Sequence, residues 1–133
     1  MYRFIWLLAF SILIVSGCAT TPVAPDAVEL AVDFSWEGIG KCSNHSPEIR
    51  VADIPPGTKS FKVKLKDFNA PNWNHGGGTV TNDGSGIIPA GALKGAYNGP
   101  CPPGGSHKYQ FTVKAVNEAG IIIGIGKATK KFP

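Results

Sequence analysis

The residues of this chain that are best suited to chemistry are two histidines, an aspartate and a tyrosine. Asp67 ends a lysine-rich stretch, His75 precedes three glycines, and His107 and Tyr109 stand two residues apart. Imidazoles and carboxylates bind divalent metals or carry out acid–base catalysis. Their spacing fits no metal-binding pattern such as H-x-x-x-H, however, and no serine or cysteine lies in a nucleophile motif such as G-x-S-x-G. We therefore expect no metal, no cofactor and no enzyme.

The alternation of apolar and polar residues predicts β-strands. It is strict from Val28 to Trp36 and again over 61–66 and 108–115, with the period of a half-buried strand. Shorter strands are expected at 79–81, 121–125 and 128–132. With 17 glycines, 11 prolines and 17% charged residues, the composition favours short strands and turns over helices. The predicted class is all-β with little helix.

Three glycines, 76–78, stand directly before the strand expected at 79–81. A glycine run beside a strand indicates that the backbone approaches another group closely, either at a bulge or at a ligand. The sequence leaves both alternatives open.

Lysines occupy the polar positions of two predicted strands, 61–66 and 108–115. The chain has 13 Lys and Arg against 9 Asp and Glu, a formal charge of +4. The lysines are not clustered with aromatic residues, and no nucleic-acid-binding motif accompanies them. We therefore expect a solvated sheet face and no nucleic-acid partner.

The N-terminus has the features of an export signal. Arg3 precedes a mostly apolar run from Phe4 to Val15, which is shorter than the roughly 20 residues of a membrane helix but suits a signal peptide. The following Ser16-Gly17-Cys18, with Val15, resembles the lipobox of bacterial lipoproteins. This resemblance implies cleavage before Cys18 and attachment of acyl chains such as palmitate to it.

The expected organisation is a signal peptide at 1–17, a lipidated, proline-containing tether at 18–27 and one domain at 28–133. Ala19 replaces the aspartate that signals inner-membrane retention in such lipoproteins, so the resemblance implies an outer-membrane protein that faces the periplasm.

Cys42 and Cys101 remain as an even pair in an exported, oxidising environment, which predicts a disulfide. Closing a loop of about 60 residues stabilises the fold by roughly 4 kcal/mol in the chain-entropy model. Free buried thiols or metal ligands are the alternative, but there is no C-x-x-C spacing.

A longer resemblance runs from residue 46 to residue 116. Its most specific element is Y-x-G-P-x-P-P-x-G-x-H-x-Y at 97–109, preceded by Asp67-Phe68-Asn69-Ala70-Pro71 and by Trp73-Asn74-His75. These segments resemble the phosphatidylethanolamine-binding protein family, in its bacterial Raf-kinase-inhibitor-like branch. The resemblance implies a β-sandwich with a small anion pocket at one end, here in a short version.

The same resemblance implies the residues of a ligand site, in which imidazole and phenol donors hold phosphoryl oxygens and a carboxylate orients a histidine. The sequence of this chain differs from the family pattern at Phe68, Asn69, Gly76 and Lys108. The implied anion-binding residues are Asp67, His75, Gly99, Pro100, Pro102, Pro103, His107 and Tyr109.

The first functional hypothesis is a lipid-anchored binding module that uses this pocket for a small anion, a phosphoryl head group or a protein side chain. The second is a structural or inhibitory interaction domain with a vestigial pocket and a protein partner. The third is a hydrolase that uses Asp67, His75 and His107.

Overall fold

A computed structural model describes residues 20–133, so the predicted signal peptide and Cys18 lie outside the described residues. The all-β prediction is confirmed, and in residues 20–133 no helix is long or apolar enough to cross a membrane. The strands are β1 (Val23–Glu29), β2 (Ala31–Phe34), β3 (Ile49–Ala52), β4 (Thr58–Asp67), β5 (Gly77–Thr81), β6 (Ile87–Ile88), β7 (Lys108–Asn117) and β8 (Ile122–Lys131).

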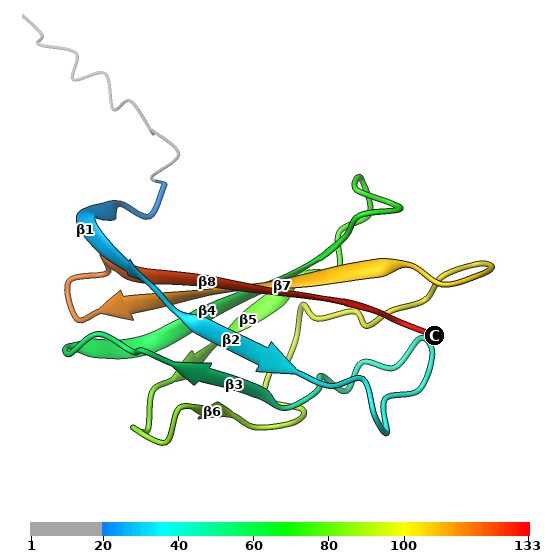
Figure 1. The fold of residues 1–133 in the computed structure, drawn as a ribbon, viewed down its shortest axis with the longest axis horizontal. Helices are drawn as coiled ribbons and strands as arrows, with labels where there is room; N and C mark the ends of the chain where they lie inside the picture. The colour runs from blue at the N-terminus through cyan, green and yellow to red at the C-terminus, as the bar shows by residue number, and fades with distance from the viewer. Residues whose placement is uncertain (1–19) are drawn as a thin grey trace, which may run out of the picture.

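The strands form a sandwich of two sheets (Figure 1). The larger sheet has the order β1-β8-β7-β4-β5, and the smaller has the order β2-β3-β6. All neighbours are antiparallel except β1 and β8. The smaller sheet covers one face of the larger sheet, whose other face is open. We call the latter the open face.

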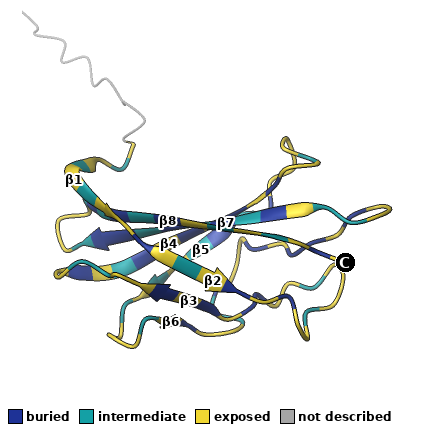
Figure 2. Ribbon diagram, viewed as in Figure 1, coloured by how far each residue is buried: buried dark blue, intermediate teal, exposed yellow. Residues whose placement is uncertain are grey.

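The alternation of the long strands places their apolar side chains between the sheets. On β7, Tyr109, Phe111 and Val113 are completely buried, and Phe61 and Leu65 of β4 are almost so. Figure 2 shows buried segments on β3 and β7, where the sheets face each other. Among residues 20–133, the core side chains come from residues 30–132, that is, from both sheets and the loops between them.

The prediction of one strand from Val28 to Trp36 is wrong in one respect, because this segment is divided between two sheets. The chain leaves β1 at Leu30, whose backbone N–H donates to the carbonyl of Ile125 at 3.0 Å, and β2 then pairs with β3. A strand that turns the corner of a sandwich keeps its alternation, so the pattern does not reveal the change of sheet. β1 also begins at Val23, within the segment that we expect as a tether.

The C-terminal pair of short strands is also a misprediction, because β8 is continuous from Ile122 to Lys131. Gly126 and Lys127, which separate the two predicted strands, are paired in register with β7. Gly126 is required there because a Cβ atom would lie 2.4 Å from the carbonyl oxygen of Leu30. The glycine therefore allows β8 to pass beneath the crossing chain.

The structure joins Cys42 to Cys101 by a disulfide, as predicted. Two backbone hydrogen bonds accompany it: the N–H of Cys42 donates to the carbonyl of Pro100 at 2.7 Å, and that of Gly99 to Ser43 at 3.1 Å. The loop after β2 is thus fastened to the loop that precedes β7.

The glycine run before β5 allows the chain to approach itself. Gly76 has a φ of +66°, and a Cβ atom there would lie 1.7 Å from the carbonyl oxygen of Ala96. A Cβ atom at Gly77 would lie 1.9 Å from the carbonyl oxygen of Val63 on β4. The close approach of one backbone segment to another accounts for Gly76 and Gly77, so no ligand is needed to explain these glycines.

Candidate functional site

A pocket of about 380 Å³ opens at the end of the sandwich where β4 finishes and β7 begins. This volume lies in the range of small-ligand sites. Two segments that are distant in sequence meet there: the end of β4 with the loop that follows it, and the loop before β7 with the first residues of that strand. The lining residues are Asp67, Ala70, Trp73, His75, Cys101, Pro102, Pro103, His107 and Tyr109.

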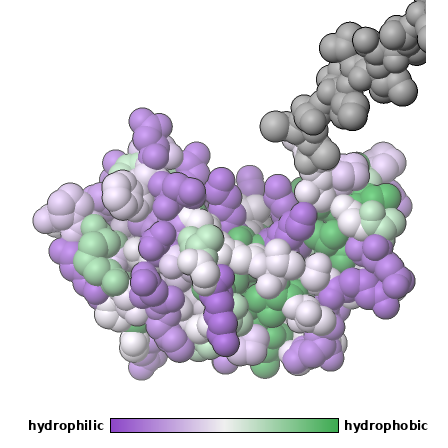
Figure 3. Space-filling view, turned by 180° about the vertical axis from the view of Figure 1, so that it is seen from behind, coloured by the Kyte–Doolittle hydropathy of each residue, from purple (hydrophilic) through white to green (hydrophobic). Residues whose placement is uncertain are grey.

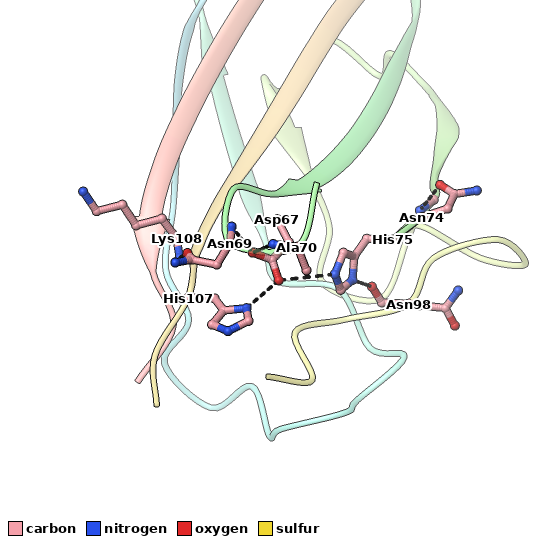
Figure 4. Close-up of polar contacts among 9 residues, drawn as sticks. Asp67, Asn69, Ala70, Asn74, His75, Asn98, His107 and Lys108 are labelled. Atoms are coloured by element: carbon pink, nitrogen blue, oxygen red, sulfur yellow. Dashed lines mark hydrogen bonds and ion pairs between the residues drawn. The ribbon is translucent and has the colours of Figure 1, made fainter. Parts of the chain in front are cut away.

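The carboxylate of Asp67 is the centre of the polar contacts in this pocket (Figure 4). Its Oδ2 atom accepts a hydrogen bond from Nδ1 of His107 at 2.7 Å, and its Oδ1 atom accepts from the backbone of Asn69 at 2.8 Å and of Ala70 at 3.2 Å. Burial raises the pKa of Asp67, but the hydrogen bonds from His107 and Asn69 outweigh burial and hold it below its ordinary value. Asp67 is therefore ionised at neutral pH.

His75 lies on the other side of the same carboxylate. Its Nε2 atom is 3.9 Å from Oδ2 of Asp67, and its Nδ1 atom is 2.8 Å from the backbone carbonyl of Asn98. A carbonyl only accepts hydrogen bonds, so Nδ1 of His75 carries a proton. By the same argument, Nδ1 of His107 carries the proton that it donates to the ionised Asp67. Each Nε2 atom becomes a donor only when its imidazole takes up a second proton.

Tyr109 is completely buried, and its hydroxyl has no hydrogen-bond partner among residues 20–133. Burial, together with the neighbouring charge of Asp67, raises the pKa of Tyr109 to about 12. The carboxylate acts on the phenol as a nearby charge, although no hydrogen bond of ordinary geometry joins them. The hydroxyl is therefore protonated at neutral pH, and this buried donor belongs to a residue of the pocket wall.

The eight residues implied by the resemblance do not all line this pocket. Asp67, His75, Pro102, Pro103, His107 and Tyr109 do, whereas Gly99 and Pro100 do not. Gly99 and Pro100 are buried behind the loop. Their backbones form hydrogen bonds there with those of Ser43 and Cys42, respectively.

Sequence reasoning missed Trp73 and Ala70 as lining residues and the carbonyl of Asn98 as the partner of His75. Trp73 was detectable in principle, because a tryptophan in a polar loop is an unusual feature of a sequence. In the structure its side chain is 67% exposed. The carbonyl of Asn98 leaves no signal in the sequence, since any residue type supplies one.

Asn69 shows how the site accommodates a departure from the family pattern. Its side-chain Oδ1 atom accepts the backbone N–H of Lys108 at 2.9 Å, while its own backbone N–H donates to Asp67. Asn69 thus joins the turn after β4 to the start of β7, next to His107. Phe68, a second departure, points outward and is 47% exposed.

A larger hollow of about 500 Å³ lies against β2 and β3. Of its charged side chains, Arg50 binds Glu48 at 3.0 Å and Asp33 binds Lys130 at 2.7 Å, whereas Glu37 forms no ion pair among the described residues. Among the described residues, no three His, Cys, Asp or Glu side chains are grouped to hold a metal ion. The pocket around Asp67 is therefore the better candidate for a functional site.

The fold and this end pocket define a sandwich protein with a small, largely apolar pocket between its loops, into which a few polar side chains are set. The sequence profile described as "Phosphatidylethanolamine-binding protein" matches residues 20–132. The chain belongs to the phosphatidylethanolamine-binding protein family.

Two relatives come from Escherichia coli K12. The chain is 33% identical to the UPF0098 protein YbcL over 116 residues, which cover 66% of this chain and 62% of that protein. It is 37% identical to the UPF0098 protein YbhB over 98 residues, which cover 56% of this chain and 61% of that protein. The chain thus spans about three fifths of the length of these relatives.

Two solved structures share the fold. The crystal structure of E. coli YbcL, described as a new member of the mammalian PEBP family, has a TM-score of 0.52 and 24% identity, and covers 67% of this chain and 80% of that chain. A putative phosphatidylethanolamine-binding protein homolog from Chlamydia trachomatis has a TM-score of 0.53 and 18% identity, and covers 81% of this chain and 98% of that chain.

Proposed function

We propose that the pocket around Asp67 binds a small anion or a phosphoryl head group, and that the protein acts by binding rather than by catalysis. The observation that supports this most directly is the hydroxyl of Tyr109, a buried donor without a partner among residues 20–133. An unsatisfied buried hydroxyl costs free energy that a ligand oxygen recovers.

The two histidines supply the charge that an anion requires. His107 is held by Asp67 at 2.7 Å and His75 by the carbonyl of Asn98 at 2.8 Å, so both rings are oriented before a ligand arrives. When the rings are doubly protonated, the Nε2 atoms donate charge-assisted hydrogen bonds, which are stronger than neutral ones. The carboxylate of Asp67 partly balances this charge.

The pocket is better suited to binding than to hydrolysis. Pro102, Pro103 and Trp73 provide much of its wall, and none of them carries out proton transfer. Asp67 has both oxygens occupied by hydrogen bonds within the chain, so it is not placed as a free nucleophile. These side chains shape a site for a head-group-sized ligand.

The test is a titration of the protein with inorganic phosphate and phosphoethanolamine, followed through the histidine ring signals by NMR. The chain has three histidines, and His45 is exposed and outside the pocket, so it serves as an internal control. Saturable shifts of His75 and His107, with His45 unmoved, are expected. His75→Ala and His107→Ala should each weaken binding at least tenfold, and His45→Ala should not. Equal affinities in all three variants would exclude the pocket.

We also propose that the protein is held at the cell envelope by acyl chains on Cys18, in the outer membrane and facing the periplasm. Acyl chains contribute about 0.8 kcal/mol per buried methylene, so several give lasting anchorage. Cys18→Ala should move the full-length protein from the membrane fraction to the soluble fraction and abolish incorporation of radiolabelled palmitate. Membrane retention of the unlabelled variant would contradict the lipid anchor.

A further inference from the structure

The open face of the larger sheet carries most of the positive charge of the protein. The register pairs Lys62 with Lys114 and Lys108 with Lys131, and paired residues point to the same side of an antiparallel sheet. Alternation along β4, β7 and β8 adds further lysines to this side. Seven of the eleven lysines therefore lie on the open face: Lys62, Lys64, Lys66, Lys108, Lys114, Lys127 and Lys131.

These lysines have no carboxylate partner among residues 20–133. The lysine that does form an ion pair there is Lys130, which lies on the opposite side of β8. Like charges directly opposite each other destabilise a sheet, and the face contains two such pairs. The face is therefore complementary to an extended negative surface.

Two exposed aromatic side chains stand at the pocket end of this face. Phe68 is 47% exposed, and the ammonium group of Lys66 lies 5.5 Å from the centre of its ring. Trp73 is 67% exposed and lines a surface hollow together with Lys64 and Lys66. Tryptophan and lysine side by side are typical of the interface between lipid and water, where the ring enters the headgroup layer.

The described chain begins on the same side of the molecule. The ammonium group of Lys62 donates to the hydroxyl of Thr21 at 3.1 Å, so the N-terminal residues meet the open face. Figure 1 shows that the start of β1 and the loop between β4 and β5 rise on one side of the larger sheet. In Figure 3, hydrophilic side chains gather along that upper side next to the grey segment. Thr21 is three positions after Cys18 in the sequence, a reach of at most about 11 Å.

We propose that the open face docks on an anionic phospholipid surface, with Trp73 and Phe68 entering the headgroup layer. The lysines approach the lipid phosphates, and a lipid on Cys18 would bring this face rather than another to the membrane. The proposal relies on the proposed anchor for that orientation only, and it requires nothing of the ligand pocket. Docking would turn Trp73, which lines both the pocket and the face, toward the head groups.

The first experiment measures binding of residues 20–133, which contain the two described sheets, the core between them and the disulfide, to phospholipid vesicles. Thermal unfolding of the fragment checks that it is folded. Vesicles with about 30% phosphatidylglycerol should bind it at low salt, whereas vesicles of phosphatidylcholine alone should not, and added salt should release it. One lysine near such a surface contributes on the order of fivefold in affinity. Lys62→Gln with Lys114→Gln should therefore weaken binding about 25-fold.

The matched control removes two positive charges elsewhere. Arg50 lies on the outer side of the smaller sheet, and Lys41 lies in the exposed loop after β2. Arg50→Gln with Lys41→Gln has the same net charge as the lysine variant and should bind within twofold of the wild type. Equal losses in both variants would reduce the effect to net charge and overturn the proposal. Binding to a soluble polyanion such as heparin, without binding to the vesicles, would overturn it as well.

Tryptophan fluorescence reports insertion independently of affinity. Residues 20–133 contain two tryptophans, of which Trp36 is 8% exposed and Trp73 is 67% exposed. Anionic vesicles should shift the emission to shorter wavelength in the wild type and not in Trp73→Phe. In the full-length protein in bacterial membranes, a membrane-impermeant amine reagent should label Lys41 faster than Lys114. A bound fragment without the spectral shift, or equal labelling of the two lysines, would contradict docking by this face.

Discussion

The Nδ1 atom of His107 lies 2.7 Å from the Oδ2 atom of Asp67, a side chain that is only 3% exposed. The contact joins the residue immediately before β7 to the last residue of β4, and the two strands are neighbours in the larger sheet. It orients the imidazole, directs Nε2 away from the carboxylate and keeps Asp67 ionised. The pocket is consequently arranged before any ligand binds, which reduces the entropy that binding must offset.

The hydroxyl of Tyr109 provides a test that separates binding from stability. Tyr109→Phe removes an oxygen that has no partner among the described residues, so the free energy of unfolding should stay within about 0.5 kcal/mol of the wild type or rise. Affinity for phosphate should fall about tenfold, because one hydrogen bond to the ligand is lost. Thermal unfolding and a phosphate titration check the two parts. A loss of stability above about 1.5 kcal/mol would mean that the hydroxyl has a partner in the free protein.

Acid should destabilise the fold through Asp67. Burial raises its pKa, but the hydrogen bonds from His107 and Asn69 lower it more, so its pKa in the folded state lies below the ordinary value of about 3.9. Its contribution is therefore present above about pH 4 and is lost as the pH falls through the folded value. In Asp67→Asn the unfolding free energy should change less between about pH 5 and pH 2 than in the wild type.

The control for this acid effect is Asp83, an exposed aspartate whose pKa is also lowered, by hydrogen bonds from Ser85. Because Asp83 is fully exposed, Asp83→Asn should leave the pH profile of stability close to that of the wild type. If the pH profile of Asp67→Asn coincides with the profiles of the wild type and of Asp83→Asn, then Asp67 does not contribute to the loss of stability in acid.

The approach between Gly76 and Ala96 predicts a large effect of a single methyl group. Gly76→Ala would place a Cβ atom 1.7 Å from the carbonyl oxygen of Ala96, so it should cost about 3 kcal/mol or more. Gly57 is the matched control, since its φ is +87° but nothing lies within 4 Å of its Cβ position. Gly57→Ala should cost only about 1–2 kcal/mol, from the backbone conformation alone. Similar losses in urea unfolding would contradict the close approach.

The disulfide should support both the fold and the pocket. Cys42→Ser removes a crosslink across 59 positions and should lower the free energy of unfolding by about 4 kcal/mol under oxidising conditions. It should also weaken phosphate binding, because Cys101 lines the pocket. A wild-type melting temperature that is unchanged by reduction would mean that the crosslink does not contribute.

The sequence by itself determined the parts that depend on local period and local chemistry. The alternation of β4 and β7 predicted which side chains are buried, and hence that their lysines face outward, because side-chain direction in a strand has a period of two. The motif around Asp67, His75 and His107 identified residues that meet in the pocket, and the two cysteines that remain beside Cys18 identified the disulfide.

Only the tertiary structure decided which partner each segment meets. A period of two reports that a face is buried but not the sheet that buries it, so the passage of the chain between sheets at Leu30 was invisible. Backbone groups carry no sequence signal, so neither the carbonyl of Asn98 that holds His75 nor the carbonyl of Ala96 beside Gly76 could be anticipated. The open face likewise exists only because the register of three strands gathers lysines that are far apart in the sequence.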